Sequence, residues 1–265
     1  MTARALPETC CPDQRTLWLW PARAIYLGPS FDLDAHSGSV HCFALGVDAP
    51  FDLHSAETGR RRTRSAFIPA RTEHHIVATG RVLFSYADSL DVRDHMTEHS
   101  STVAFTHRDE LALLQHLQHA RPVSPEFLRG HLDRGTAIDE RIRAATQTLQ
   151  ADPARVVSAA ALAAEVNLST SRFLHLFAQH TGTSFRRYRL WARMTKVGHA
   201  ISTGANITTA ATDAGFASAN HFSDTFHAMF GLTATALLAA GTRVVIQDNA
   251  AAEPPHAESR PHNRP

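Results

Sequence analysis

One short residue pattern occurs twice in the second half of this chain, and it constrains the fold more than any other feature. The first copy consists of Ala163, Asn167, Phe173, Phe177 and Gly182, and the second consists of Ala211, Gly215, Phe222, Phe226 and Gly231. The aromatic residues and the closing glycines lie 49 positions apart, whereas the small residues and the turn residues lie 48 apart. A unit of about 20 residues therefore occurs twice, and the second copy has one extra residue between its turn residue and its first phenylalanine.

Each copy predicts two short helices joined by a tight turn. Asn167 and Gly215 stand where the turn needs positive φ, which asparagine and glycine tolerate best. Each second helix buries its pair of phenylalanines and ends at the closing glycine. Helix N-caps are expected at Ser158, Ser169, Thr208 and Ser218. The pattern thus indicates two helix-turn-helix units.

A long helical stretch separates the units, from a Ser184 cap to Gly204. About 20 residues at roughly 1.5 Å each give a rod of roughly 30 Å. This is close to the rise of one turn of B-DNA, about 34 Å, so the rod can hold two reading helices one turn apart. Before the first unit, Ile138, Ile142, Ala145 and Leu149 form one amphipathic helical stripe that ends at Asp152-Pro153.

The first half of the chain has a different periodicity. Short apolar runs end at turn residues: 17–20, 24–27, 40–47, 66–68 and 81–86. They predict a small β-sandwich or barrel, with the charged stretch 57–64 as a loop tip. Residues 109–120 then change to helical spacing, with Leu111, Leu114 and Leu117 on one stripe. This helix either packs on its own β domain or pairs with a second copy of the chain.

We therefore expect an α+β protein with the following divisions. Residues 1–120 form the β domain after a loose arm (1–15), residues 121–136 a linker, residues 137–247 an all-α domain, and residues 248–265 a disordered tail.

Composition narrows the function only moderately. The formal charge is +1, but residues 136–248 hold 10 basic and 7 acidic side chains, against 14 and 16 in residues 1–135. A mildly basic second half fits a surface that meets phosphate. Three cysteines cannot form a disulfide framework in 265 residues. With no signal segment and no apolar run long enough to span a bilayer, we expect a soluble cytoplasmic protein that does not bind membranes.

Residues 138–240 resemble the DNA-binding domain of AraC/XylS-type transcription regulators. The resemblance rests on Leu162-Ala163, Asn167-Leu168-Ser169, Phe173, Phe177, Gly182-Thr183-Ser184-Phe185, Tyr188, Arg193, Ala211, Ala214-Gly215-Phe216, His221-Phe222, Phe226, Phe230 and Gly231. It implies seven helices and two helix-turn-helix units whose second helices enter consecutive major grooves. Ala234 and Leu237 depart from the family pattern, which has a proline and an aromatic residue there.

Residues 1–120 resemble more faintly the cupin-like sensor domain of such regulators, through the 65–70 stretch, His74-His75 and the 81–86 strand. The resemblance implies double-stranded DNA as a partner and a small-molecule effector in the N-terminal domain. It also implies RNA polymerase as a partner if the protein is an activator, and a possible homodimer. We expect no enzymatic activity.

The outward residues of each second helix are the predicted DNA contacts. They are Thr170, Ser171, Arg172, Leu174, His175 and Gln179 in the first, and Ala219, Asn220, His221 and Asp224 in the second. Asn220 can pair with adenine, Asp224 can accept from a cytosine amino group, and Leu174 can touch only a thymine methyl. Each could instead be a solvated helix residue. We expect the first of these helices to anchor the protein on DNA and the second to adjust its sequence specificity.

Several arginines are expected to position the protein or its helices. Arg172, Arg186, Arg187 and Arg189 are candidate phosphate contacts, which position a protein without reading sequence. By family resemblance, Arg193 ties helices together through an ion pair.

The 18 histidines do not form a recognisable metal motif. His74 and His75 are adjacent, so in a strand they point to opposite faces and cannot both ligate one metal. We therefore predict no metal and no cofactor. The alternative hypothesis is a cupin-type metal- or thiol-dependent enzyme or sensor fused to a DNA-binding domain, with Cys10 and Cys11 as its reactive residues. Cys42 lies in an apolar run and is better explained as a core residue.

Overall fold

The computed structural model describes residues 14–88, 95–100, 102–120, 122–132 and 138–247. The expected disordered tail and nearly all of the expected N-terminal arm lie outside these residues. The described residues up to 132 are called the N-terminal half, and residues 138–247 the helical half. None of the described helices has both the length and the apolar character needed to cross a membrane.

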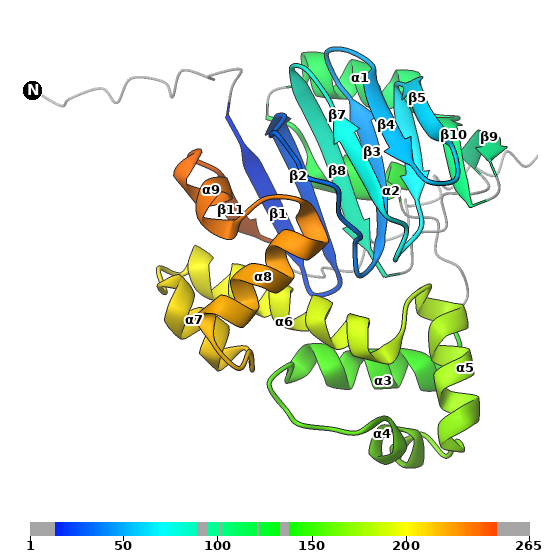
Figure 1. Cartoon of the computed structure of the whole chain (residues 1–265), viewed down its shortest axis with the longest axis vertical. Helices are drawn as coiled ribbons and strands as arrows, with labels where there is room; N and C mark the ends of the chain where they lie inside the picture. The colour runs from blue at the N-terminus through cyan, green and yellow to red at the C-terminus, as the bar shows by residue number, and fades with distance from the viewer. Residues whose placement is uncertain (1–13, 89–94, 101, 121, 133–137, 248–265) are drawn as a thin grey trace, which may run out of the picture.

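Two sheets build the N-terminal half (Figure 1). Its strands are β1 (Thr16–Trp20), β2 (Arg23–Pro29), β3 (His41–Gly46), β4 (Phe51–Ser55), β5 (Gly59–Thr63), β6 (Ser65–Ile68), β7 (His74–Val77), β8 (Arg81–Ala87), β9 (Met96–Ser100) and β10 (Val103–His107). The larger sheet has the order β11-β1-β2-β8-β3-β6-β10-β9, and the smaller has β5-β4-β7. Four of the five predicted runs lie wholly within strands, and the fifth, 40–47, extends one residue beyond each end of β3. The loop predicted at 57–64 is wrong in part, because residues 59–63 pair with β4 as a hairpin strand.

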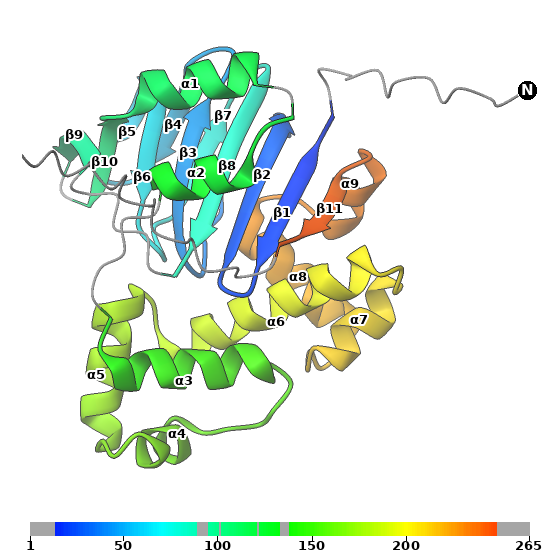
Figure 2. The same cartoon turned by 180° about the vertical axis from the view of Figure 1, so that it is seen from behind.

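The larger sheet buries an apolar cluster on each face. One face is covered by α1 (Glu110–His119) and α2 (Pro125–Leu132), as the view from behind shows (Figure 2). Leu113 and Leu117 are buried against it, whereas Leu111 is 69% exposed, so the predicted stripe is rotated by part of a turn. Helix α2 occupies much of the segment expected to be a linker. It forms because Leu128 and Leu132 reach the same apolar cluster.

The helical half contains the seven helices that the resemblance implies. They are α3 (Glu140–Ala151), α4 (Ala159–Glu165), α5 (Thr170–Thr181), α6 (Phe185–Ser202), α7 (Ile207–Asp213), α8 (Ala219–Phe230) and α9 (Ala234–Ala239). Helices α4–α5 and α7–α8 are the two helix-turn-helix units, and α6 is the 18-residue rod between them (Figure 2). Each unit has its own apolar cluster, around Phe173 and Phe177 in one and Phe222 in the other.

Local turn chemistry explains where these helices begin and end. Asn167 has φ 55° and Gly215 has φ 89°, as the pattern predicts. A side chain at Gly215 would also meet the Ala154 backbone at 2.9 Å, so both conformation and space require glycine. Helices α5 and α8 end at left-handed glycines, Gly182 and Gly231.

The predicted N-caps are right with one exception. Ser158, Ser169, Ser184 and Ser218 each accept a backbone N–H at a helix start. Helix α7 starts two residues earlier than expected, because Asn206 rather than Thr208 caps it by accepting the Thr209 N–H.

The chain returns to the first sheet at its end. After α9, strand β11 (Arg243–Ile246) pairs in parallel with β1, with Arg243 opposite Thr16 and Ile246 opposite Leu19. No sequence pattern predicted this strand. Because of it, a strand from the helical half completes the edge of the N-terminal sheet, and the two halves share one continuous sheet (Figure 1).

Candidate nucleic-acid interface and the cavity beneath it

Helix α5 presents all of its predicted contacts to solvent. Thr170, Ser171, Arg172, Leu174, His175 and Gln179 are exposed, while Phe173, Leu176 and Phe177 are buried on the opposite side. Leu174 is 41% exposed, which leaves an apolar side chain among the polar ones. The outward face therefore offers hydroxyl, amide, imidazole and guanidinium groups, the donors and acceptors that reach base edges and phosphates.

Helix α8 presents a smaller outward face. Asn220, His221 and Asp224 are exposed, whereas Ala219 is half-buried. The Ala217 N–H points at Nδ1 of His221 at 3.4 Å, which leaves Nε2 as the donor toward solvent. Asn220 and Asp224 are one helical turn apart, so an amide and a carboxylate lie side by side on this face.

The neighbouring Arg186 and Arg187, both predicted to contact phosphate, are placed differently in the structure. Arg186 is exposed, but Arg187 is half-buried. The Nη1 group of Arg187 donates to the carbonyl of Ser37 at 3.1 Å and to the carbonyl of Gly38 at 3.2 Å. Burial lowers the pKa of Arg187, and the neighbouring Arg71 lowers it further. Arg187 is thus bound to the N-terminal half rather than presented to phosphate.

Arg193 does tie helices together, but not through the expected ion pair. Its Nε donates to the carbonyl of Pro153 at 3.1 Å, and its side chain lies against Gly215. A backbone carbonyl between α3 and α4 therefore takes the place of the carboxylate. Arg189 donates to the carbonyl of Val157 at 3.3 Å in the same region.

The C-terminal end of α8 is bonded to the N-terminal half. Backbone N–H groups of Asp34 and Ser37 donate to the carbonyls of Gly231 (2.8 Å) and Ala228 (3.1 Å). His227 Nε2 lies 2.9 Å from Asp34 Oδ2. Sequence reasoning missed this contact, since nothing in the loop around residue 34 signals a partner almost 200 residues away.

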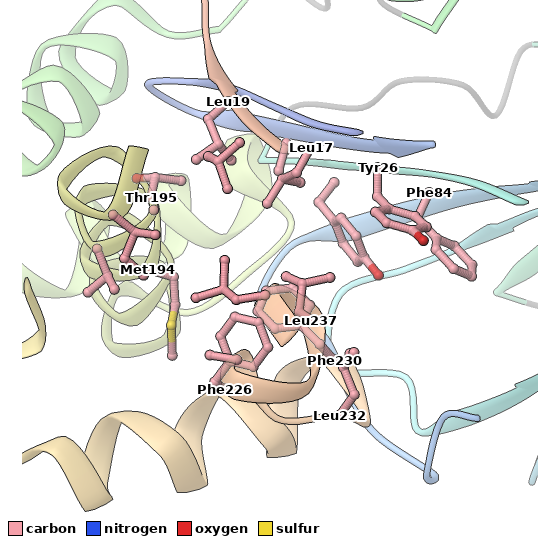
Figure 3. Close-up of a pocket in the computed structure, with 18 of the residues that line it drawn as sticks. Leu17, Leu19, Tyr26, Phe84, Met194, Thr195, Phe226, Phe230, Leu232 and Leu237 are labelled. Carbon is pink, nitrogen blue, oxygen red and sulfur yellow. The ribbon is translucent and has the colours of Figure 1, made fainter. Parts of the chain in front are cut away.

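A cavity of about 100 Å³ lies between the two halves (Figure 3). The sheet contributes Leu17, Leu19, Tyr26 and Phe84, and the helical half contributes Met194, Thr195, Phe226, Phe230, Leu232 and Leu237. None of the residues that line it carries a charge. The second reading helix is therefore one wall of an apolar cavity.

The polar groups of this cavity are already satisfied. The Tyr26 hydroxyl donates to the carbonyl of Pro29 at 2.7 Å, and Thr195 Oγ1 donates to the carbonyl of Ala192 at 2.9 Å. Burial raises the pKa of Tyr26 to about 12, so the phenol stays neutral. The Tyr86 hydroxyl meets the Cys42 thiol, and burial raises the pKa of both groups. An occupant therefore gains mainly by burying apolar surface.

A second, more polar cavity of about 330 Å³ adjoins the first, and the two share Leu19 and Thr195. It is lined by Trp20, Pro21, Gln150, Ala151, Pro153, Ala192, Lys196, His199, Ile246 and Gln247. Lys196 is the only lysine of the chain. A cation and an imidazole thus stand beside the apolar cavity.

The histidines and cysteines of the described residues do not gather into a metal or thiol site. Among the residues that the structure describes, no group of three or more His, Cys, Asp and Glu side chains could hold a metal ion. His74 is buried and half-buried His75 pairs with His54 on the other face of β7, as adjacency requires. Burial raises the pKa of Cys42 to about 12, which keeps the thiol protonated and unreactive. Cys10 and Cys11 lie outside the described residues.

Comparison with known proteins gives one family and one fold. A family model described as a helix-turn-helix domain, of the AraC type, matches residues 162–240. No curated protein matches the chain. The structure of ToxT from Vibrio cholerae with a bound unsaturated fatty acid is similar at TM-score 0.56 and 12% identity, over 83% of this chain and 96% of that one. ToxT bound to (E)-4-(8-methylnaphthalen-1-yl)but-3-enoic acid is similar at TM-score 0.53 and 13% identity, over 83% and 99%. The chain therefore shares its two-part fold with these proteins.

Proposed function

We propose that the chain is a DNA-binding transcription regulator, on the strength of its AraC-type helix-turn-helix domain, and that an apolar effector in the cavity between its halves controls DNA binding. The observation that carries this proposal is the position of α8. Phe222, Phe226 and Phe230 line the cavity, while Asn220 and Asp224 are exposed on the outward face of the same helix. An occupant that shifts α8 therefore shifts its base-reading side chains.

The mechanism is a population shift between two placements of α8. In the closed form, α8 is held by the Asp34 and Ser37 N–H groups, and Arg187 is held by Ser37 and Gly38. In an open form, Arg187 becomes available to phosphate, together with exposed Arg172 and Arg186. An effector changes the balance only by the difference in its affinity for the two forms. The proposal therefore requires that effector and DNA influence each other's affinity.

The effector class follows from the two adjoining cavities. The apolar cavity of about 100 Å³ is smaller than a usual ligand site of roughly 300–1,000 Å³, so an occupant must extend beyond it or widen it. The polar cavity supplies room and places Lys196 and His199 nearby. Both ligands in these ToxT structures combine an apolar body with one carboxylate. We assign the site to a medium-chain or long-chain carboxylic acid.

The partners and domain roles follow from the same arrangement. Residues 14–132 act as the effector-binding half, and residues 138–247 as the DNA-binding half of a cytoplasmic regulator without catalytic activity. Helix α5 anchors the protein on one major groove through Ser171 and His175, and α8 tunes specificity in the next. Exposed Leu111 on α1 supports a homodimer through this helix. RNA polymerase is the further partner if the protein activates transcription.

Calorimetry with cis-9-hexadecenoic acid tests the effector site. Leu237 lines the cavity, whereas Ala236 is exposed on the same helix. Leu237→Trp fills the cavity and should abolish binding, and Ala236→Trp is the matched control that should leave it unchanged. Lys196→Gln should weaken binding by roughly tenfold, the loss of about 1.4 kcal/mol from one charge-assisted bond. Equal affinity in wild type and Leu237→Trp would show that the acid binds elsewhere.

A further inference from the structure

Strand β11 is the last element of the helical half, yet its hydrogen bonds are made with the N-terminal sheet. The Arg243 N–H donates to the carbonyl of Arg15 at 2.9 Å, and the Gln247 N–H donates to the carbonyl of Leu19 at 2.8 Å. In a strand, the N–H groups of alternate residues point to the same side. Val245 lies midway between Arg243 and Gln247, opposite Trp18, so its N–H also points at β1. Ile246 is the residue between two that face β1, so its own N–H points away from β1.

The side chains of β11 contact both faces of the sheet. Val245 packs against the apolar cluster under α1 and α2, whereas Val244 and Ile246 pack on the opposite face. Val244 also lines the apolar cavity, and Ile246 lines the polar one. The strand therefore closes both cavities along one side.

The strand is short and held from one side only. It has four residues, it is the outermost strand of the described sheet, and none of the four side chains is fully buried. Central strands such as β8 are bonded on both edges and buried along most of their length. An edge strand with one ladder and half-buried side chains opens at lower free energy than the sheet centre.

A single left-handed glycine connects β11 to the wall of the cavity. Gly241 has φ 76°, and nothing lies within 4 Å of the position of a Cβ atom there. It follows α9, whose Leu237 and Leu238 line the apolar cavity. The turn thus has open space at Gly241, while Thr242 beside it is buried and the Ala240 carbonyl accepts from Arg15 Nη1 at 3.3 Å. These two contacts break when β11 swings away from β1 and α9 stays folded.

We propose that β11 is a detachable strap, which must leave β1 before α8 and α9 can separate from the N-terminal half and admit an occupant to the cavity. While β11 is paired, the helical half is held at both ends of the contact: by the strap beside β1, and by the Asp34 and Ser37 bonds at α8. Without the strap, the remaining ties are the bonds at α8 and the side-chain bonds from α6, namely Arg187 to Ser37, Tyr188 to Asp88 and Trp191 to Ala22, and these then open more often. The proposal rests on the proposed function only for the identity of the occupant.

Amide hydrogen exchange of the intact protein, measured by NMR, tests the strap without any ligand. The amides of Asp34 and Ser37 report opening, since both donate across the halves. Val245→Pro removes a β1 bond, whereas Ile246→Pro, the matched control, removes an N–H that β1 does not use. We expect Val245→Pro to speed exchange at both reporters at least about tenfold, with Ile246→Pro and the amides between β2 and β8 near wild type. Unchanged reporters in Val245→Pro would overturn the proposal.

A reversible lock gives the opposite test. Thr16 and Arg243 are paired in register, and neighbouring strands lie about 4.8 Å apart, within the span of a disulfide. Thr16→Cys with Arg243→Cys, in a background with Cys10→Ser and Cys11→Ser, fixes the strap when oxidised. Oxidation should slow exchange at Asp34 and Ser37 and slow uptake of the uncharged dye N-phenyl-1-naphthylamine, and reduction should restore both.

The two readouts separate the strap from the effector site. Exchange that responds to the lock, with no dye uptake in either state, would contradict the cavity as a binding site while supporting the strap. Exchange and uptake that are the same in the oxidised and reduced protein would overturn the strap.

Discussion

Asp34 and His227 join the two halves of the molecule across 193 positions of sequence, with His227 Nε2 2.9 Å from Asp34 Oδ2. The backbone of Asp34 makes the firmer contact, because its N–H donates to the carbonyl of Gly231 at 2.8 Å. The side-chain pair is solvated, with the His227 side chain 44% exposed and the Asp34 side chain 75% exposed. The loop around Asp34 therefore holds the end of the reading helix mainly through its backbone.

The first prediction separates these two contributions. Asp34→Asn should change the free energy of unfolding by less than about 1 kcal/mol, as expected for an exposed pair. Gly231→Ala should cost about 2 kcal/mol or more, since it forces a left-handed residue and places Cβ 2.4 Å from the carbonyl oxygen of Asp34. Gly204→Ala is the control, because Gly204 also has a positive φ, of 93°, but open space around it. Urea unfolding measures all three, and equal costs at Gly231 and Gly204 would contradict a close contact.

The second prediction concerns acid stability. Burial lowers the pKa of His74 to about 4, below the unfolded value of 6.5. The folded state therefore prefers neutral His74, and stability is lost as the pH falls from about 6.5 toward 4, with no further loss below that. Linkage gives about 2 kcal/mol at pH 5 from this residue. His74→Asn keeps a donor for the carbonyl of Thr72, which His74 Nδ1 now contacts at 3.0 Å. It should remove most of that loss between pH 7 and pH 5 in chemical unfolding, and an unchanged pH slope would contradict the assignment.

The third prediction distinguishes reading from positioning. Asn220→Ala should lower the preference for one base at one operator position by about 1–3 kcal/mol. The base preferences at the other operator positions should change little. Arg186→Ala should instead weaken binding to all sequences alike and lower the salt slope by about 1. Anisotropy titrations on an operator and its single-base variants, at several salt concentrations, measure both. A uniform loss for Asn220→Ala would exclude it from base readout.

The fourth prediction tests the first turn. Asn167 adopts φ 55°, so Asn167→Gly should be close to neutral, whereas Asn167→Ala should cost about 1 kcal/mol or more in unfolding free energy. An alanine variant as stable as the glycine variant would mean that the turn relaxes out of its left-handed conformation.

The parts of this fold that could be predicted are those that short-range chemistry determines. The repeated turn residues, the glycine helix ends and four of the five expected serine or threonine caps, counting Ser184, all follow from neighbours a few positions away. The β11 strand and the bond from Arg187 to Ser37 could not be predicted, because each depends on a partner more than 140 positions distant. The exposure of Leu111 could not be predicted for a related reason: spacing gives a helical stripe, but only packing on the sheet decides which residues lie at its centre.

Of the candidate site, the outward, DNA-facing side of the helices could be predicted from the sequence, but the cavity on their inner side could not. The outward side chains of α5 are where the 3.6-residue period puts them, since the phenylalanines define the buried side. The apolar cavity could not be predicted, because the repeat already explains Phe222 and Phe226 as core residues. Their second role requires the loop around Asp34 and the β1 edge, which are distant in sequence.

The central claim is that an occupant of the cavity and the DNA influence each other through α8, and one thermodynamic cycle tests it. The dissociation constant of operator DNA is measured with and without saturating cis-9-hexadecenoic acid, and that of the acid with and without saturating DNA. Linkage requires both to change by the same factor, about 5–150 for a typical allosteric coupling. We expect that factor in wild type and its loss in Leu237→Trp. A factor of one in wild type, with both ligands bound, would contradict the account.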